Sequence, residues 1–350
     1  MRWFVVIPGA LVPAALANDV LSAFANRSLA AQLAHARLSN EPSLVAGATH
    51  WSWIWHQYGG IGQPITAPYA WRALNHSSAV EAHSEVALHH ADPVHFAFAR
   101  DHLIVKSLTP TPVTATEAQA LAADAEPAVR DAGATLRVVG ASHWFLSFRP
   151  DWSLDTVPLD AALAESVSDV MPAGSDASRW RKLLNDVQIG WHQHAVNAAR
   201  EERGDRTINS LWLHGGGVWR SLPRAPFAAI ASNGPVLRGW ALASGLAPAS
   251  LFKDDATPPA RGDVLSLWRD LLEPARFEAW GDWLAALQDI EARLASLLRR
   301  SLDAGYRELV LVLCGRQQVR RVTLSAHDRY AFWRRSSMSS VFAEAGFPLR

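Results

Sequence analysis

The sequence predicts an α/β fold: a mostly parallel sheet flanked by helices, with a smaller α+β domain inserted into the core. Three observations predict it. Residues 3–7 and residues 309–313 are unbroken apolar runs, which are typical of strands buried in a parallel sheet. Residues 280–298 carry apolar side chains at three- and four-residue steps, which is the pattern of a long helix packed on such a sheet.

The first strand imitates a leader peptide. Arg2, the apolar stretch 3–17 and the triplet Ala15–Ala17 resemble a secretory signal with its cleavage site. Pro8 and Gly9 interrupt that stretch, which favours a buried strand ending in a turn. The other predicted core elements are helices at 14–38, 178–203 and 328–342, a strand at 228–232 and an exposed loop at 248–263.

The inserted domain is predicted from a change of pattern that begins at Asp92. Apolar and polar side chains alternate there, and a short polar connection joins two strand-like runs into a hairpin. Thr116 is the expected N-cap of the helix that follows. The predicted elements are strands at 94–98 and 103–105, a helix ending near Arg130, and strands at 135–139 and 144–148. The core would then comprise residues 1–91 and 160–350, and the insertion residues 92–159.

The composition excludes several classes of protein. Hydrophobic residues make up 49% of the 350 residues, so the chain can bury a substantial core. Its 33 basic residues balance 33 acidic ones, which gives no electrostatic reason to expect nucleic-acid or membrane-surface binding. No apolar run is long enough to span a membrane. The single cysteine, Cys314, fits a reducing, cytoplasmic compartment, and its apolar surroundings predict a buried side chain.

The segment 194–217 combines a helix end, an apolar strand and three consecutive glycines. Near its start an imidazole, an amide and a guanidinium recur at three-residue steps, so on one helical face they could bind a carboxylate or a phosphate. The glycines could cradle an anion with backbone N–H groups. The candidate ligand-binding set is therefore His194, Asn197, Arg200, Asn209, Gly215, Gly216 and Gly217. The alternative is structural: a helix end anchored to a loop, followed by a tight turn.

Two other features invite a functional interpretation. The 14 histidines include the pairs His89–His90 and His192/His194, but neither spacing presents two metal ligands on one helical face, so we predict no metal site there. Residues 51–71 are rich in tryptophan and tyrosine. These rings could stack on a ligand or partner, or they could pack loops against the core. No Gly-x-Ser-x-Gly motif is present, and we predict no catalytic residue.

The segment 194–217 also carries a family resemblance. His194–Asn197, Arg200 and Ile208–Gly217 resemble the HPVN-x-x-R and AN…G-x-G pattern of the archaeal-type, cofactor-independent phosphoglycerate mutases, with Ala195 in place of the proline. These enzymes belong to the alkaline phosphatase superfamily, so the resemblance implies an alkaline-phosphatase-like core. Supporting matches are Ser168–Asp169, Ala91–Phe96 and Glu117–Ala118. A narrower resemblance, to bacterial regulatory proteins of the Rpf type (regulation of pathogenicity factors), rests on the same elements and the tryptophan-rich N-terminal third.

The resemblance implies a two-metal site with a serine or threonine nucleophile, but four segments depart from the family's pattern. The first strand ends in Pro8–Gly9 rather than Asp-Gly. Thr49–Ser52 is preceded by Ala46–Ala48, where the nucleophile is expected. Residues 274–279 replace a ligand segment, and Cys314–Arg316 replaces an Asp-His pair. Pro, Ala and Gly side chains cannot hold divalent ions.

Three functions are compatible with these observations. The first is a non-catalytic, mutase-like regulatory protein that binds a small phosphorylated or carboxylated metabolite or a protein partner, with no cofactor. The second is an active mutase or phosphatase with two divalent metals such as manganese, whose ligands would come from His50, His56, Asp169, Asp254, Asp255 and His327. The third is a protein-interaction module that uses residues 51–71.

Overall fold

The computed structural model describes residues 1–24, 28–42, 46–75, 86–149, 151–232, 234–252, 262–325, 328, 333 and 335–345. The chain forms two compact units. The core unit comprises Met1–Pro64 and Leu222–Arg350, and the inserted unit comprises Ile65–Ser221. The inserted unit therefore extends beyond the predicted 92–159 on both sides, because the strand at 210–217 pairs with the strand that opens the insertion.

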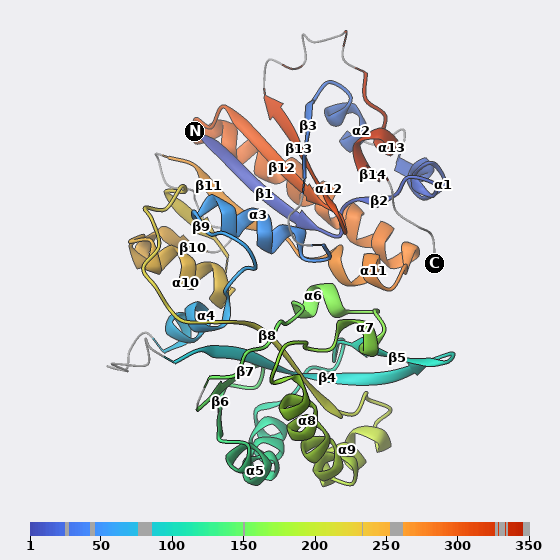
Figure 1. Cartoon of the computed structure of the whole chain (residues 1–350). Helices are drawn as coiled ribbons and strands as arrows, with labels where there is room; N and C mark the ends of the chain where they lie inside the picture. The colour runs from blue at the N-terminus through green and yellow to red at the C-terminus, as the bar shows by residue number, and fades with distance from the viewer. Residues whose placement is uncertain are drawn as a thin grey trace. The chain divides into compact units, whose positions relative to one another are not determined.

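The core unit contains a seven-stranded sheet in the order β10-β9-β11-β1-β12-β13-β3 (Figure 1). Its five strands from β10 to β12 are parallel, and β13 runs antiparallel to both neighbours. The predicted α/β class with a mostly parallel sheet is confirmed. The strands are β1 (Arg2–Pro8), β3 (Arg37–Pro42), β9 (Ala229–Ala231), β10 (Leu251–Phe252), β11 (Val264–Leu267), β12 (Glu308–Cys314) and β13 (Gln318–Ser325).

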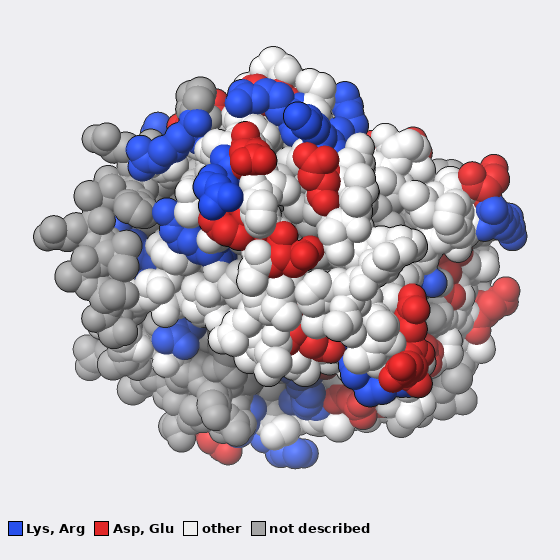
Figure 2. All heavy atoms as spheres, turned by 90° about the horizontal axis from the view of Figure 1, so that it is seen from below, with Lys and Arg blue, Asp and Glu red and all other residues white. Residues whose placement is uncertain are grey.

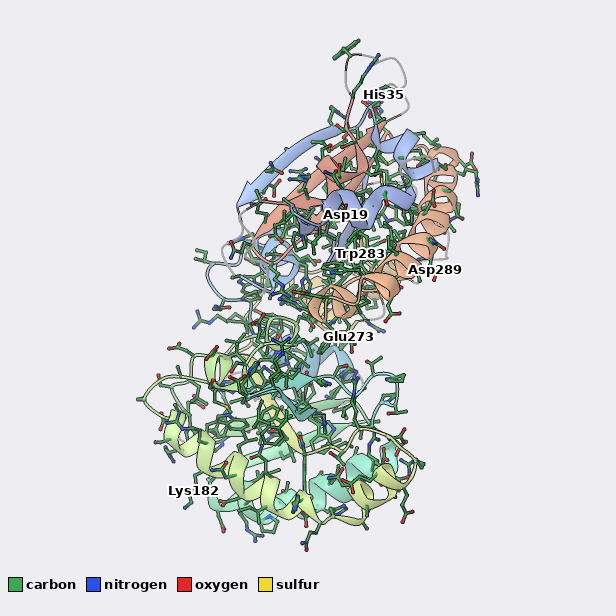
Figure 3. All side chains as sticks on the ribbon, turned by 90° about the vertical axis from the view of Figure 1, so that its right-hand side faces the viewer. Asp19, His35, Lys182, Glu273, Trp283 and Asp289 are labelled. Carbon is green, nitrogen blue, oxygen red and sulfur yellow. The ribbon has the colours of Figure 1, made fainter. Side chains whose placement is uncertain are left out.

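Helices cover both faces of this sheet. The long helix α12 (Trp280–Asp303) packs its apolar stripe on one face, where Trp283 lies in the interior while Asp289 on the same helix points to solvent (Figure 3). The other face meets α3 through Phe4 and Trp53, whose ring centroids lie 6.1 Å apart. The remaining helices and short strands of the unit are α1 (Ala17–Leu21), α2 (Ser28–Leu33), α3 (Thr49–Gln57), α10 (Pro235–Ala243), α11 (Leu272–Arg276), α13 (Met338–Phe342), β2 (Val12–Pro13) and β14 (Ala343–Glu344).

Two predicted core helices are wrong in extent. The helix predicted at 14–38 is two short helices, α1 and α2, because residues from Arg37 onward form β3 and hydrogen-bond to β13. The helix predicted at 328–342 is described only as α13, at its C-terminal end. Strand β13 was not predicted, although Val319, Val322 and Leu324 are its buried apolar positions. Most of the predicted loop at 248–263 lies outside the described residues.

The inserted unit is built on a five-stranded sheet in the order β5-β4-β7-β6, with β8 also paired to β4. Helices α5 and α8 pack on each other below this sheet in Figure 1, and α4, α6 and α7 lie above it. The elements are α4 (Ala67–Leu74), β4 (Leu88–Ala99), β5 (His102–Lys106), α5 (Ala115–Asp131), β6 (Ala134–Val139), β7 (His143–Phe148), α6 (Leu159–Ala162), α7 (Val167–Val170), α8 (Ala177–His192), α9 (Ala195–Glu202) and β8 (Ser210–Gly217).

The predicted hairpins and helix of this unit are confirmed, with two corrections. The N-cap of α5 is Thr114 rather than Thr116: its hydroxyl accepts from the Glu117 N–H, and the Glu117 carboxylate accepts from the Thr114 N–H. The single helix predicted at 178–203 is two helices, α8 and α9, because His194 ends the first and caps the second.

No helix among the described residues is long and apolar enough to cross a membrane. The basic and acidic residues, which are equal in number, are also mixed in space. On the face drawn in Figure 2, basic and acidic side chains lie between broad uncharged areas, without a large region of one sign.

Candidate functional site

A pocket opens in the core unit at the carboxyl ends of β1 and β12, the edge where α/β sheets commonly bind ligands. Pro8 at the end of β1 lies opposite Cys314 at the end of β12. The chain then turns at Gly9 with a φ of 73°, and Trp283 donates a 2.8 Å hydrogen bond from Nε1 to the Gly9 carbonyl oxygen. The pocket wall is thus fixed to the buried face of α12.

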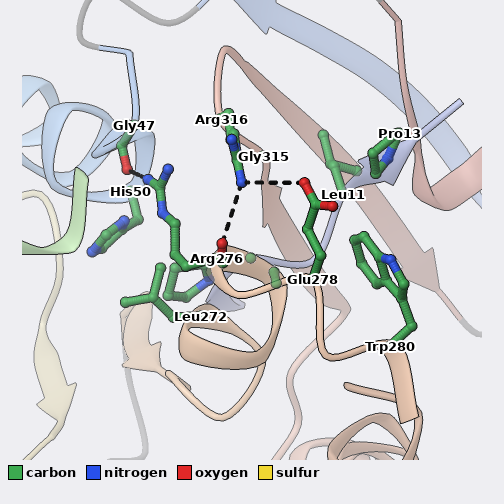
Figure 4. A pocket seen from close by; sticks show the side chains of 13 residues that line it. Leu11, Pro13, Gly47, His50, Leu272, Arg276, Glu278, Trp280, Gly315 and Arg316 are labelled. Atoms are coloured by element: carbon green, nitrogen blue, oxygen red, sulfur yellow. Dashed lines mark hydrogen bonds and ion pairs between the residues drawn. The ribbon is translucent and has the colours of Figure 1, made fainter. Parts of the chain in front are cut away.

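Two arginines line this pocket. Arg276, at the end of α11, is 5% exposed and donates from Nη2 to the Gly47 carbonyl oxygen. Arg316 follows β12, and its Nη2 lies 3.4 Å from the Arg276 carbonyl oxygen and 3.9 Å from Glu278 Oε1. Figure 4 shows both guanidinium groups among the lining side chains, Arg276 turned toward Gly47 and Arg316 toward Glu278. Two guanidinium groups and one carboxylate therefore line the pocket.

The first turn of α3 forms another part of the wall. Gly47 and His50 line the pocket, and the backbone N–H of Gly47 donates to the Arg316 carbonyl oxygen at 2.6 Å. The Thr49 hydroxyl donates to the Gly315 carbonyl oxygen at 2.7 Å. The N-cap, Ala48, has no side-chain acceptor for the free N–H groups of the first turn. Because Gly47 and His50 line the pocket, the positive end of the α3 dipole lies beside it.

The opposite side of the pocket is mixed in character. Glu278 has a left-handed backbone, with a φ of 54°, and its side chain is 37% exposed. Trp280, Leu11, Leu272 and Pro13 supply apolar surface next to it (Figure 4). The recess is narrow: about 20 Å³ of it is open to a water-sized sphere, and the wider empty space of about 430 Å³ includes open solvent at its mouth.

A second carboxylate, that of Glu344, lies directly behind the pocket wall. It is 1% exposed and accepts backbone N–H bonds from Arg316 (2.9 Å), Gln317 (2.7 Å) and Gln318 (2.9 Å). A Cβ on Gly315, which lines the pocket, would collide with this carboxylate. The backbone N–H groups of the turn after β12 thus form an anion-binding nest, and the Glu344 carboxylate occupies it.

The four segments that depart from the mutase pattern come together here. The residues of these segments that line the one pocket are Pro8, Gly9, His50, Ala275, Arg276, Glu278, Gly315 and Arg316. These segments were predicted only to lack the metal ligands of the mutase pattern, and it was not predicted that their arginines line one pocket. The signal was available, because two of the segments directly follow predicted parallel strands. Glu344 had no such signal, since its partners lie 26 to 28 residues away.

The candidate residues of segment 194–217 lie in the inserted unit, and two of them are engaged by the protein itself. Asn197 is 3% exposed; its Nδ2 donates to the carbonyl oxygens of Trp191 and Ile208, and its Oδ1 accepts from the Ile208 N–H. Arg200 is 1% exposed and donates to Glu117 Oε2 at 2.9 Å and to backbone carbonyl oxygens, among them that of Arg206. These contacts anchor α9 to its neighbours.

The other candidates are also held in local structure. His194 is the N-cap of α9, so it does not share a helical face with Asn197, and its Nδ1 accepts from the Val196 N–H at 3.1 Å. The Asn209 side chain pairs with both backbone groups of Phe96 on β4. The glycines Gly215–Gly217 end β8 rather than forming a turn after it.

The glycine run lets the side chains of β4 approach β8 closely. A Cβ on Gly216 would collide with the His89 ring, and one on Gly215 with Thr66. His89 and His90 point to opposite faces of β4. His90 stacks on His214 at a centroid distance of 4.8 Å, and His214 Nε2 lies 2.9 Å from Asp92 Oδ2. Within the described ranges, no three His, Cys, Asp or Glu side chains are placed to hold a metal ion.

Trp53 and Trp55 are buried at 6% and 5% exposure, and Tyr58 and Tyr69 at 1%, so these rings of the 51–71 segment are core rather than an interaction surface. Cys314 is buried, and burial raises the pKa of its thiol. Of the residues that a metal site might recruit, His50 and His56 lie on α3 and Asp169 on α7, whereas Asp254, Asp255 and His327 lie outside the described residues.

Comparison with known proteins shows similarity of fold. No family model matches the sequence, and no curated protein sequence is significantly similar to it. The structure of the PH0037 protein from Pyrococcus horikoshii is similar, with a TM-score of 0.50 at 10% identity over 97% of this chain and 91% of that chain. The cofactor-independent phosphoglycerate mutase from Thermoplasma acidophilum DSM 1728 has a TM-score of 0.39 at 14% identity, over 97% of this chain and 94% of that chain. The likeness to the PH0037 structure is one of fold alone.

Proposed function

We propose that this protein is a non-catalytic, regulatory ligand-binding protein that holds a small carboxylated or phosphorylated metabolite in the pocket of the core unit. The observation that carries the proposal is the pair of guanidinium groups, from Arg276 and Arg316, at the carboxyl edge of the parallel sheet. Guanidinium presents forked N–H donors that match the oxygens of carboxylate and phosphate.

The backbone around the pocket adds to this preference for an anion. The first turn of α3 begins at Thr49 beside Gly47 and His50, and no side chain caps it. Helix N-termini carry a partial positive charge and unsatisfied N–H groups, which favour an anion. The helix end alone would not define a site, but here it faces the same pocket as two arginines.

The same residues do not fit the pair of divalent cations that the mutase resemblance implies. Among the described residues lining the pocket, Glu278 is the carboxylate and His50 the imidazole, and both share the pocket with guanidinium groups. A divalent cation needs several oxygen or imidazole donors, and a guanidinium repels it. The donor set therefore supports ligand binding without metal-dependent phosphoryl transfer.

The pocket replaces the candidate set drawn from segment 194–217. The polar atoms of Asn197 and Arg200 form hydrogen bonds with the protein's own backbone and with Glu117. We therefore propose that these two residues hold α9 in position. A regulatory role of the Rpf type and a cytoplasmic location remain predictions from the sequence. A protein partner bound through residues 51–71 is not proposed, because Trp53 and Trp55 are buried.

Isothermal titration of the full chain with acetate, inorganic phosphate and 3-phosphoglycerate tests the proposal. We expect at least one of these anions to bind, and Arg316→Met to weaken that binding at least tenfold. Arg316 suits this test because its backbone N–H, rather than its side chain, binds Glu344. The matched control is Arg299→Met, an exposed arginine on α12, which should bind as the unmodified chain does.

Metal analysis distinguishes the catalytic alternative. The purified chain would be incubated with manganese, its metal content measured, and mutase and phosphatase turnover assayed. Stoichiometric manganese together with turnover would overturn the proposal. If Arg316→Met leaves the affinity for the anion unchanged, the anion binds elsewhere on the protein, and this result would also contradict the proposal.

A further inference from the structure

We infer that the metabolite held in this pocket is a small zwitterion, a free α-amino acid, whose carboxylate meets the arginines and whose ammonium group meets Glu278. This inference rests on the proposed function and narrows its ligand class. It follows from the distribution of charge around the pocket, from the conformation of Glu278 and from the apolar surface beside it.

The charge around the pocket is balanced rather than positive. Arg276 and Arg316 contribute two positive charges. Glu278 contributes a negative charge within the pocket, and Glu344 contributes another directly behind Gly315. A phosphate dianion would leave this region with two excess negative charges at close range, whereas a zwitterion leaves it neutral. Unbalanced charge in a partly buried site is costly, so the balance favours a zwitterion.

Glu278 is placed for a ligand rather than for a strong internal ion pair. Its Oε1 lies 3.9 Å from Arg316 Nη2, beyond hydrogen-bonding distance, and its side chain remains 37% exposed. Its backbone is left-handed at φ 54°, which is strained for a residue with a side chain. Strain of this kind persists where the surroundings impose it, and it gathers at binding sites. The turn is held by the Ala279 N–H, which donates to the Pro274 carbonyl oxygen at 2.9 Å.

The surface next to Glu278 suits the rest of an amino acid. The Trp280 ring and the Leu11 side chain lie beside the Glu278 carboxylate in Figure 4. An indole face stabilises an ammonium group by cation–π attraction, and the aliphatic side chains can cover an apolar substituent.

The test compares leucine with two analogues that each lack one of its charges. Isothermal titration of the full chain would use leucine, 4-methylpentanoate (no ammonium group), 3-methylbutylamine (no carboxylate) and inorganic phosphate. A thermal-shift screen of the twenty free amino acids would first identify any amino acid preferred over leucine, with its analogues chosen to match. We expect the amino acid to bind at least tenfold more tightly than either analogue and than phosphate.

Variants then assign the two ends of the ligand. Glu278→Gln should weaken amino-acid binding about tenfold and should not weaken binding of the deaminated analogue, whereas Arg316→Met should weaken both. Asp289→Asn, an exposed carboxylate on α12, is the control and should change neither. Equal binding of the amino acid and its deaminated analogue, or a preference for phosphate, would overturn this inference and leave the proposed function standing. If no amino acid and no other anion binds, both fall.

Discussion

Arg200 and Glu117 form an ion pair that joins α9 to the start of α5 inside the inserted unit. Arg200 Nη1 lies 2.9 Å from Glu117 Oε2, and the arginine side chain is 1% exposed. Burial alone would raise the pKa of Glu117, but its hydrogen bond with the Thr114 backbone and the Arg200 charge hold that pKa below its usual value. The guanidinium also donates to the Thr111 carbonyl oxygen at 2.5 Å. One side chain therefore fixes three segments.

Removing this arginine should destabilise the inserted unit. Arg200→Met removes the buried partner of Glu117, which keeps its bonds from Thr114 and Arg203, and removes the guanidinium from two backbone carbonyl groups. Breaking a buried pair in this way costs about 3–5 kcal/mol. Urea denaturation followed by tryptophan fluorescence measures the loss. Arg203→Met is the matched control, because Arg203 also contacts Glu117, at 3.2 Å, but is 52% exposed and should change stability little. Equal losses for the two variants would contradict the assignment.

The sequence predicted correctly those strands and helices whose own residues carry a clear apolar pattern. Strands β1 and β12 are apolar runs, and α12 carries its apolar stripe along most of its length, so tertiary context had little to add. The break between α8 and α9 was missed because residues on both sides favour helix and the capping role of His194 depends on a single Nδ1 contact. Strand β3 was missed because pairing with β13 overrides its mixed composition.

The candidate site was predicted in part. The sequence pointed to four altered segments, and the structure brings those segments to one pocket. It could not show that Arg276 and Arg316 line the same pocket, since that depends on how α11 and the turn after β12 fold back on α3. Conversely, Asn197 and Arg200 were predicted as ligand contacts because the sequence does not reveal which polar atoms the backbone already uses.

The turn at Gly9 should tolerate no side chain. Its φ of 73° is unfavourable for alanine, and a Cβ would come within 2.7 Å of the Leu272 Cα atom, which is backbone and cannot move aside cheaply. We expect Gly9→Ala to lower the free energy of unfolding by about 3 kcal/mol or more, from the left-handed strain and overpacking together. Gly245→Ala is the control: its φ is 82° but its Cβ would meet nothing within 4 Å, so about 1 kcal/mol is expected. Chemical denaturation of the two variants compares the losses, and similar values would show that strain alone matters.

Acid should destabilise the inserted unit through two buried histidines. Burial, followed by the charge of His214, lowers the pKa of His89 to about 4 and that of His90 to about 3. In the unfolded chain both would titrate near 6.5. The unfolded state therefore binds more protons below that pH, so the stabilising effect of neutral imidazoles is complete above about pH 6.5 and is lost as the pH falls toward 4.

The pH dependence can be measured directly. Each histidine should contribute a slope of about 1.4 kcal/mol per pH unit between roughly pH 6 and pH 4.5. Denaturation curves at several pH values would show this slope, and His89→Phe should reduce it by half. His102, an exposed histidine on β5, supplies the control variant His102→Phe, which should leave the slope unchanged. A stability that is flat across this range in the unmodified chain would rule out the neutral, buried state of these rings.

Glu344 should hold the C-terminal strand against the pocket wall. Its carboxylate accepts three backbone N–H bonds, and its own carbonyl oxygen accepts from the Ala14 N–H at 3.1 Å, next to the pairing of β14 with β2. Glu344→Ala leaves the three N–H groups of the turn without their acceptor. Because hydrogen bonds to a buried charge are the strong ones, we expect a loss of about 3 kcal/mol in the free energy of unfolding.

Hydrogen exchange locates this effect as well as measuring it. In the Glu344→Ala variant the amides of Gln317 and Gln318 should exchange much faster, because no other acceptor replaces the carboxylate. Amides in the middle of β12 should exchange faster only by the factor that the loss of global stability gives. Gln318→Ala is the control, since it removes only the side-chain bond from Nε2 to the Ala345 carbonyl oxygen and keeps the backbone N–H. If the turn amides of Glu344→Ala remain as protected as those of Gln318→Ala, the nest does not depend on this carboxylate, and Glu344 would no longer count in the charge balance behind Gly315.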